Sequence, residues 1–206
     1  MRAHQHQITD LPALEALFGA VGEASISKET TSLCAVYRQW IEASPFAVLA
    51  TVGPLGLDAS PRGDPAPLVK VLDEHTLLLP ERRGNNRIDS LRNIVADPRV
   101  ALIFLIPGVG ETLRVNGQAR ISIAPERLAE LALQGKAPTC VIEIHIESVF
   151  FQCARAVQRA RLWRERTDAP IDVPTAGAML AALSAGQIDG TQYDLALPQR
   201  QRDTLY

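Results

Sequence analysis

Arginine, asparagine and serine side chains gather in two neighbouring stretches of the sequence. The first is Asp58–Asp64 (DASPRGD), and the second is Pro80–Asn93 (PERRGNNRIDSLRN), where arginines surround a Gly-Asn-Asn turn directly before an expected helix over Asn85–Ala96. A glycine lets a ligand approach the backbone, helix N-terminal amides point outward, and guanidinium groups bind phosphate oxygens. This combination predicts a phosphate-binding site. Its arginines are Arg82, Arg83 and Arg87, with Arg62 closing the site from the end of a neighbouring strand.

A solvated surface turn is the alternative for the same segment, because arginines are mostly exposed and pair with nearby carboxylates. The acidic residues close in sequence are Glu81, Asp89 and Asp97. The segment has neither the Walker A pattern G-x-x-x-x-G-K-[ST] nor the G-x-G-x-x-G pattern of a dinucleotide site. Residue chemistry alone therefore leaves both a phosphate site and a solvated turn open.

The other reactive residue types form no recognisable catalytic or metal-binding motif. Cys34, Cys140 and Cys153 are scattered without a C-x-x-C pair, which excludes a zinc knuckle and a thioredoxin-like redox pair. His75 falls in an expected turn and His145 on the polar face of an expected strand, and no serine hydrolase motif accompanies them. The sequence therefore assigns no catalytic residue and no metal ligand.

Composition and charge are those of an ordinary globular protein. The 206 residues are 47% hydrophobic and 21% charged, with a formal net charge of −2 at pH 7. This balance offers no general attraction for nucleic acid or an anionic membrane. The longest apolar stretch, Val100–Val109, is far shorter than the ~20 residues of a membrane helix, and Asp10 and Glu15 interrupt the N-terminus. We therefore expect a cytoplasmic protein that binds neither nucleic acid nor membrane.

Short strands with few helices between them dominate the middle of the chain. The expected strands are Phe46–Val52, Pro67–Leu72, Thr76–Leu79, Val100–Ile106, Thr112–Ile123 and Thr139–Phe151. Apolar and polar residues alternate in the last two, as in strands with one face in a core. Gly117 interrupts the first alternation and predicts a bend or a β-bulge, and the slip at Ser148–Val149 in the second predicts a β-bulge. Six strands without regularly alternating helices predict a mainly β, antiparallel barrel rather than a doubly wound sheet.

Helices are expected before and after the barrel and between some of its strands. Asp10 can cap a first helix. A second helix can be capped by Thr30, Thr31 or Ser32, and it ends at Pro45. Pro125–Leu133 and Thr175–Ser184 are further expected helices, the last followed by a polar tail. We divide the chain into a helical segment at 1–44, a barrel domain at 45–166, and a C-terminal helix and tail at 167–206 that packs on the barrel or on a partner subunit.

The stretch Phe46–Trp163 resembles the pyridoxamine 5′-phosphate oxidase-like proteins, a family of split barrels that bind flavin mononucleotide (FMN), and within it a bacterial subgroup. The motifs that carry the resemblance are S-P-R-G at Ser60–Gly63, G-N-N-R at Gly84–Arg87, D-P-R-V at Asp97–Val100, G-x-A at Gly117–Ala119, and the closing segment Val149–Trp163. The resemblance implies a six-stranded antiparallel split barrel with flanking helices. It also implies a homodimer with an FMN site in each of two clefts between the subunits.

The same resemblance implies which residues hold the cofactor. The family's phosphate-binding elements fall on the strand that contains Arg62 and on Arg83–Ser90, and the flavin ring would lie along Ala59–Gly63. The implied cofactor-binding residues are Ser60, Arg62, Gly63, Arg83, Asn85, Asn86, Arg87, Ser90, Arg161 and Trp163, with Trp163 or Arg161 contributed by the other subunit. Family oxidases of vitamin B6 carry an Arg–Lys pair before the helix, where this chain has Arg-Gly-Asn-Asn-Arg, so vitamin B6 is not the expected substrate.

Two functions are consistent with these patterns. The first is an FMN-dependent oxidoreductase of unknown substrate, with NAD(P)H or another small molecule as redox partner. A flavin supplies the redox chemistry itself, which accounts for the missing catalytic motif. The second is a non-catalytic flavin or tetrapyrrole binding module on the same barrel, although a haem would need an axial ligand that His75 and His145 hardly offer. We favour the enzyme by analogy with the family.

Overall fold

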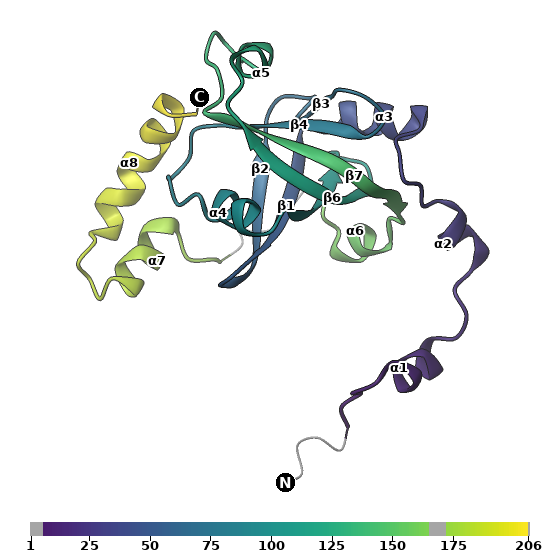
Figure 1. Ribbon diagram of the computed structural model, residues 1–206. Helices are drawn as coiled ribbons and strands as arrows, with labels where there is room; N and C mark the ends of the chain where they lie inside the picture. Colours follow the sequence, from purple (N-terminus) through teal and green to yellow (C-terminus); the bar gives the residue numbers. More distant parts are fainter. Residues whose placement is uncertain (1–5, 165–171, 206) are drawn as a thin grey trace.

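The computed structural model describes residues 6–164 and 172–205, which contain a seven-stranded antiparallel sheet. Its strands are β1 (Phe46–Gly53), β2 (Gly56–Gly63), β3 (Lys70–Val71), β4 (Thr76–Glu81), β5 (Arg99–Leu105), β6 (Thr112–Ser122) and β7 (Cys140–Gln152). They pair in the order β2-β1-β5-β6-β7-β4-β3, and the sheet curls so that β1 and β2 run across β6 and β7 (Figure 1). The expected mainly β, antiparallel fold with flanking helices is confirmed.

The sheet has seven strands where the sequence predicted six. The additional strand is β2, whose sequence GLDASPRG shows no apolar alternation, because it lies at an edge and buries no residue completely. The two edge strands, β2 and β3, do not pair with each other. The chain after β2 instead returns to the start of β1, where the Asp64 amide donates to the Pro45 carbonyl (3.1 Å) and the Leu68 amide to the Ser44 carbonyl (3.0 Å). The barrel is therefore split rather than closed.

The core fills the inside of the curled sheet. Leu113, Val115 and Ala119 of β6 are buried, as the alternation along this strand predicted. Tyr37 and Ile41 join the same core from the helix that precedes β1. The sheet therefore has a continuous apolar interior that fixes the register of its strands.

β6 passes close to the backbone of β7 at Gly117. Asn116 faces Ser148 and Gly117 faces Ile146, so Glu147 is the extra residue of a β-bulge. A Cβ atom on Gly117 would lie 1.9 Å from the carbonyl oxygen of His145. The bulge that the sequence predicted at Gly117 is confirmed, and the same bulge accounts for the slip near Ser148.

Eight helices surround the sheet in the described part of the chain. They are α1 (Leu11–Phe18), α2 (Glu23–Ser27), α3 (Ala35–Glu42), α4 (Asp89–Ala96), α5 (Pro125–Glu130), α6 (Arg155–Ala160), α7 (Ala176–Leu183) and α8 (Gly190–Asp203). The second expected helix begins later than predicted, after Cys34, because Thr30 pairs with Val149 of β7 as an isolated bridge. The amides and carbonyls of Thr30 and Val149 exchange hydrogen bonds of 3.0 and 2.8 Å, which keep this segment extended.

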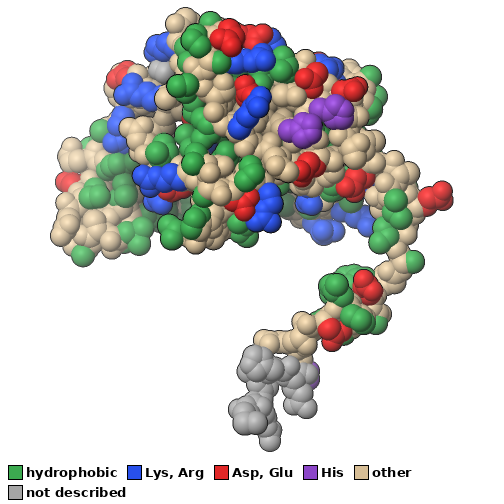
Figure 2. All heavy atoms as spheres, in the orientation of Figure 1, with side chains coloured by type: hydrophobic (Ala, Val, Ile, Leu, Met, Phe, Trp, Pro, Cys, Tyr) green, Lys and Arg blue, Asp and Glu red, His purple; other side chains and the backbone are tan. Residues whose placement is uncertain are grey.

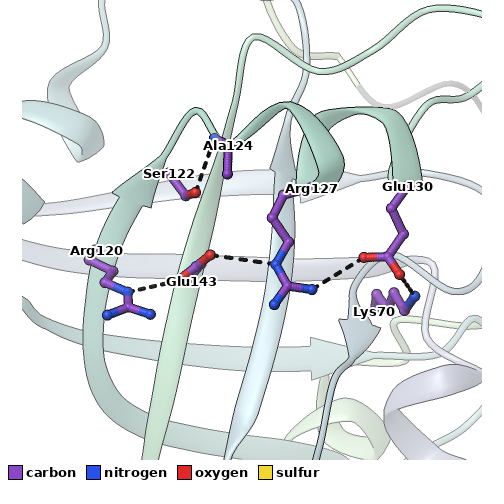
Figure 3. Close-up of polar contacts among 7 residues, drawn as sticks. All are labelled: Lys70, Arg120, Ser122, Ala124, Arg127, Glu130 and Glu143. Atoms are coloured by element: carbon purple, nitrogen blue, oxygen red, sulfur yellow. Dashed lines mark hydrogen bonds and ion pairs between the residues drawn. The ribbon is translucent and has the colours of Figure 1, made fainter.

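A chain of alternating charges fastens α5 to the sheet (Figure 3). Arg120 of β6 donates to Glu143 of β7 (2.7 Å), and Arg127 of α5 lies 3.9 Å from the other oxygen of Glu143. Arg127 also contacts Glu130 (3.4 Å), which pairs with Lys70 of β3. The network therefore joins three strands through one short helix.

The two ends of the chain form elements of their own. In α1 and α2 no residue is buried, and Figures 1 and 2 show this N-terminal arm standing away from the sheet. The segment expected as a polar tail contains the helix α8, which Asp189 caps and which packs against α7. Asp194 of α8 accepts from the Gly177 amide of α7 (2.7 Å). None of the helices described is long and apolar enough to cross a membrane.

Candidate functional site

A cavity of about 550 Å³ lies between β2, the loop after β4 and the start of α4. Small-molecule sites typically have volumes of ~300–1,000 Å³. The sequence-predicted residues that line the cavity are Ser60, Arg62, Arg82, Arg83, Asn85, Asn86, Arg87 and Ser90. Gly63 lines an adjoining cavity of about 200 Å³, which shares Arg62 and Arg83 with the larger one. The fold thus brings together the two arginine-containing stretches of the sequence.

Alternate residues of β2 turn toward this cavity. Asp58, Ser60 and Arg62 are half-buried and line it, whereas Ala59 and Pro61 between them, and Leu57 before them with 87% exposure, are exposed. The sheltered face of this strand is therefore polar, the reverse of a strand that covers a core. Sequence reasoning did not single out Asp58, and its two-residue spacing from Ser60 and Arg62 is the signal that would have found it.

Arg82 holds the arginine-rich loop to the barrel. Its Nε donates to the buried carboxylate of Asp64 (2.7 Å), and its Nη1 donates to the carbonyl of Leu131 (2.9 Å). A guanidinium with these partners is fixed in direction and largely neutralised. Arg82, one of the predicted phosphate ligands, is therefore committed to the structure of the loop.

The loop between Gly84 and α4 has an unusual backbone. The amide of Arg87 donates to the side chain of Asn85 (3.1 Å), and Asn86 and Ile88 are left-handed, with φ of 60° and 52°. Ile88 is β-branched, and such residues rarely adopt this conformation. The helix therefore begins at Asp89 rather than at Asn85 as predicted.

Arg62 is the most sheltered of the arginines that line the cavity. Its side chain is 16% exposed, and its Nη1 donates to the hydroxyl of Ser60 and to the carbonyl of Pro61 (3.0 Å). Its Nη2 lies 3.3 Å from Oε2 of Glu81. Its Nε is buried and has no hydrogen-bond partner among the described residues. Arg62 thus combines a fixed position with an unsatisfied donor.

Polar contacts between side chains fasten α4 beside β2. The hydroxyl of Ser90 donates to Asp58 (2.7 Å), and Asn93 donates to the hydroxyl of Thr51 (3.0 Å). Gly53 permits this approach, since a Cβ there would lie 2.0 Å from the side-chain oxygen of Asn93. The Ser90 hydroxyl therefore donates its one hydrogen bond to Asp58, and it must turn away from Asp58 to donate to a ligand.

The donors around the cavity fit a phosphate. Arg87 contacts Asp89 (2.8 Å) but keeps 76% of its side chain exposed, and Arg83 has no hydrogen bond or ion pair within the described residues. The N-terminus of α4 has no side-chain cap, so its first amides point outward without a partner from the cap residue. Guanidinium groups and free helix amides are the groups that bind phosphate oxygens in proteins.

Arg161 and Trp163 lie apart from this cavity within the chain. They line a different cavity of about 430 Å³, together with Gly108 and Gly110, and the two cavities share no residue. The Trp163 indole N–H donates to the carbonyl of Val109 (2.6 Å), which fixes the ring at the surface. The chain by itself does not bring Arg161 and Trp163 to the arginine-rich site.

The histidines of the barrel also lie elsewhere. The rings of His75 and His145 are 5.9 Å apart on the surface (Figure 2), and His145 lines a further cavity of about 420 Å³. No histidine lines the arginine-rich cavity, and no cluster of three or more His, Cys, Asp or Glu residues suited to a metal ion occurs in the part of the chain that the structure describes.

Residues 34–153 match the sequence profile of the pyridoxamine 5′-phosphate oxidase family, which covers more than half of the chain. This chain belongs to that family. The matched region contains all seven strands and every residue of the arginine-rich cavity. As a member of the pyridoxamine 5′-phosphate oxidase family, the chain thus has its candidate site within the part that defines the family. A search of curated proteins found no match.

Solved structures with a similar fold include three bacterial proteins. HupZ from Group A Streptococcus is 20% identical, with 59% of this chain and 95% of HupZ covered and a TM-score of 0.48. General Stress Protein 26 from Bacillus anthracis is 16% identical, with 54% and 86% covered and a TM-score of 0.41. An FMN-binding protein from Syntrophomonas wolfei is 10% identical, with 55% and 82% covered and a TM-score of 0.42. Likenesses this distant carry no argument about activity.

Proposed function

We propose that this member of the pyridoxamine 5′-phosphate oxidase family binds FMN in the arginine-rich cavity and acts as an FMN-dependent oxidoreductase. The observation that carries the proposal is the sheltered guanidinium of Arg62, which has a buried, unsatisfied Nε and faces a cavity of about 550 Å³. A buried donor without a partner costs free energy, and an anionic ligand would recover it. The family to which the chain belongs makes a flavin phosphate the anion we favour.

The proposed roles of the lining residues follow from their surroundings. Arg62, Arg83 and Arg87 would bind the phosphate, since each has donors that no carboxylate of the described residues fully occupies. Asn85, Asn86 and Ser90 would add neutral donors after a change of side-chain direction at Ser90. The flavin ring would lie along the free edge of β2, along Ala59–Gly63. When bound, FMN supplies a ring that takes up and releases electrons or a hydride.

We further propose a homodimer in which Arg161 and Trp163 of one chain complete the flavin site of the other. Two observations support this. These residues line a cavity separate from the arginine-rich one within a single chain. The outward face of the β1–β2 hairpin is apolar, with Leu55 fully exposed and Leu57 87% exposed. Exposed apolar patches commonly mark protein interfaces.

The visible spectrum of the purified protein tests the cofactor and the activity together. We expect flavin absorption bands that bleach when NADH or NADPH is added without oxygen. Heat release of the chromophore followed by mass determination should give FMN. FAD, or no flavin after reconstitution with excess FMN, would contradict the cofactor. Flavin bands that no reductant bleaches would favour a binding module without turnover, and a Soret band would favour a tetrapyrrole.

A further inference from the structure

Arg62 directs most of its donors at groups of its own chain. Nη1 donates to the Ser60 hydroxyl and to the Pro61 carbonyl, and Nη2 faces the Glu81 carboxylate at 3.3 Å. A guanidinium has five N–H donors in a planar fork that fits a carboxylate and a phosphate equally well. A ligand phosphate therefore meets an arginine whose Nη2 is already beside a negatively charged group.

Glu81 is a sheltered carboxylate with one cation beside it. Its side chain is 21% exposed, and its Oε2 is buried without a hydrogen-bond partner among the described residues. It faces Cys140 of β7, whose thiol pKa is raised by burial and by the charge of Glu81, so that the thiol stays neutral. Arg82, the next residue, is neutralised by Asp64. Burial raises the pKa of Glu81, and the attraction of Arg62 offsets part of that effect.

We propose that Glu81 is the built-in counterion of Arg62 and competes with the ligand's phosphate for that guanidinium, so that it sets how tightly phosphate-bearing ligands bind. This inference rests on the proposed function of the cavity as an FMN site. It adds a residue that acts through Arg62 and that the phosphate itself need not touch. Glu81 is in this sense a positioning residue that weakens rather than strengthens binding.

Displacement of Glu81 has a consequence for protons. When Arg62 turns its Nη2 to the phosphate, Glu81 keeps its burial, loses its cation and gains a negative charge nearby. Each of these changes favours the neutral carboxyl over the carboxylate. Phosphate binding therefore raises the pKa of Glu81 further. At a pH at which Glu81 is a carboxylate in the free protein, Glu81 takes up a proton when the phosphate binds. Competition by Glu81 for Arg62 weakens as the pH falls through the range in which the Glu81 carboxylate becomes protonated.

The test compares FMN with riboflavin, which lacks the phosphate, in the wild type and in Glu81→Gln. The amide keeps the shape of the side chain and removes its charge. We expect Glu81→Gln to bind FMN about 3- to 10-fold more tightly near neutral pH, as for loss of a competing ion pair, with riboflavin affinity unchanged. The gain should shrink as the pH is lowered. Glu143→Gln is the matched control, because Glu143 is also a sheltered carboxylate beside arginines but lies outside this cavity.

The outcomes separate this inference from the proposed function. If the wild type does not prefer FMN to riboflavin, the phosphate site itself is wrong. If the wild type prefers FMN but Glu81→Gln leaves that preference unchanged or reduces it, Glu81 is not a competing counterion. Calorimetry in two buffers with different ionisation heats counts the protons exchanged when FMN binds. Because the FMN phosphate can itself lose a proton on binding, near its second pKa of ~6, the wild type is compared with Glu81→Gln at the same pH. We expect the wild type to take up more protons per FMN bound than Glu81→Gln, and equal proton counts in the two proteins would overturn the inference.

Discussion

At the scale of single residues, the arginines around the cavity differ in how far the chain itself has engaged them. Arg82 is neutralised by Asp64 and holds the loop, whereas Arg62 has an unsatisfied Nε. Arg87 contacts Asp89 but is 76% exposed, where water weakens a charge–charge contact. The four arginines of the two sequence stretches therefore divide into two groups. Arg82 serves the structure of the loop, and the other three can bind a ligand, with Arg62 the best placed.

Removal of Arg62 should weaken FMN binding selectively. Hydrogen bonds to charged groups contribute roughly 1.5–3 kcal/mol, so Arg62→Ala should cost about 10- to 150-fold in FMN affinity, and Arg87→Ala should cost less because Arg87 is exposed. Riboflavin affinity should change little in both variants. Quenching of flavin fluorescence measures all four affinities.

Arg99 provides the control for this comparison. It contacts Asp97 (2.6 Å), lowers the pKa of that carboxyl to about 2, and does not line the cavity. Arg99→Ala should leave both affinities nearly intact. Equal losses of FMN and riboflavin affinity in Arg62→Ala would mean that Arg62 shapes the ring pocket or the fold rather than the phosphate site.

At the scale of elements, α5 depends on charges more than on burial, because none of its residues is buried. Hydrogen bonds from Lys70 and Arg127 lower the pKa of Glu130 below its ordinary value. A lowered pKa means that the carboxylate stabilises the folded state at neutral pH. That contribution is lost as the pH falls below the ordinary pKa of glutamate, ~4.3.

The docking of α5 should therefore loosen in acid and in high salt. We expect the protection factors of the α5 amides against hydrogen exchange to fall below about pH 4, while the amides of β6 stay protected. Arg127→Ala should give the same local effect at neutral pH, since it contacts both Glu130 and Glu143. Unchanged exchange in α5 under all these conditions would show that the charge network does not hold the helix.

The pairing of β6 with β7 at Gly117 should tolerate no side chain at that position. Gly117→Ala places a Cβ against the His145 carbonyl, which is backbone and cannot swing away. Overpacking of this kind typically costs about 1–3 kcal/mol, and the melting temperature should fall accordingly. Gly84→Ala is the control, because a Cβ there meets nothing within 4 Å and should leave the melting temperature nearly unchanged.

The strands with clear alternation could be predicted from the sequence almost to their ends, as β6 shows, because a half-buried strand must alternate. Edge strand β2 and helix α8 could not, since neither presents one continuous apolar face, and α8 contains Pro198. The start of α4 was predicted too early because Asn86 and Ile88 adopt left-handed conformations that a residue pattern does not reveal.

The candidate site was found in part from the sequence because its glycine, asparagines and arginines are neighbours along the chain. Its carboxylate partners lie on other strands. The pairing of Arg62 with Glu81 and of Ser90 with Asp58 depends on how β2 lies against β4 and α4. Tertiary contacts of this kind leave no periodic signal in a single sequence. The boundaries of the proposed domains at 1–44 and 45–166 stay predictions, and the junction at 166–167 lies outside the described residues.

At the scale of the whole molecule, the chain exposes apolar groups at several separate places. The N-terminal arm carries Leu17 and Phe18, and the β1–β2 hairpin carries Leu55 and Leu57, all strongly exposed. An isolated helix as short as α1 is marginally stable in water. Both features favour a second chain that covers these groups.

We therefore expect a dimer of about twice the 22.4 kDa chain mass in light scattering at micromolar concentration. Leu55→Asp combined with Leu57→Asp should weaken the dimer and, with it, flavin retention, because the partner would no longer supply Arg161 and Trp163. The control is Val173→Asp, an exposed apolar residue near α7. A wild-type monomer that still holds flavin would contradict the model of a shared site.

The open edge of β2 has a consequence for solubility. Strands with free amides and carbonyls at an edge recruit strands of other molecules, which begins aggregation. Proline on such a strand has no N–H to offer, and Pro61 stands in the middle of this edge. Pro61→Val should restore the continuous row of donors, and concentrated solutions of that variant should scatter light sooner than the wild type while the melting temperature changes little. An edge interrupted in this way stays accessible to a small ligand, but it offers a strand of another molecule too few hydrogen-bond donors to extend the sheet.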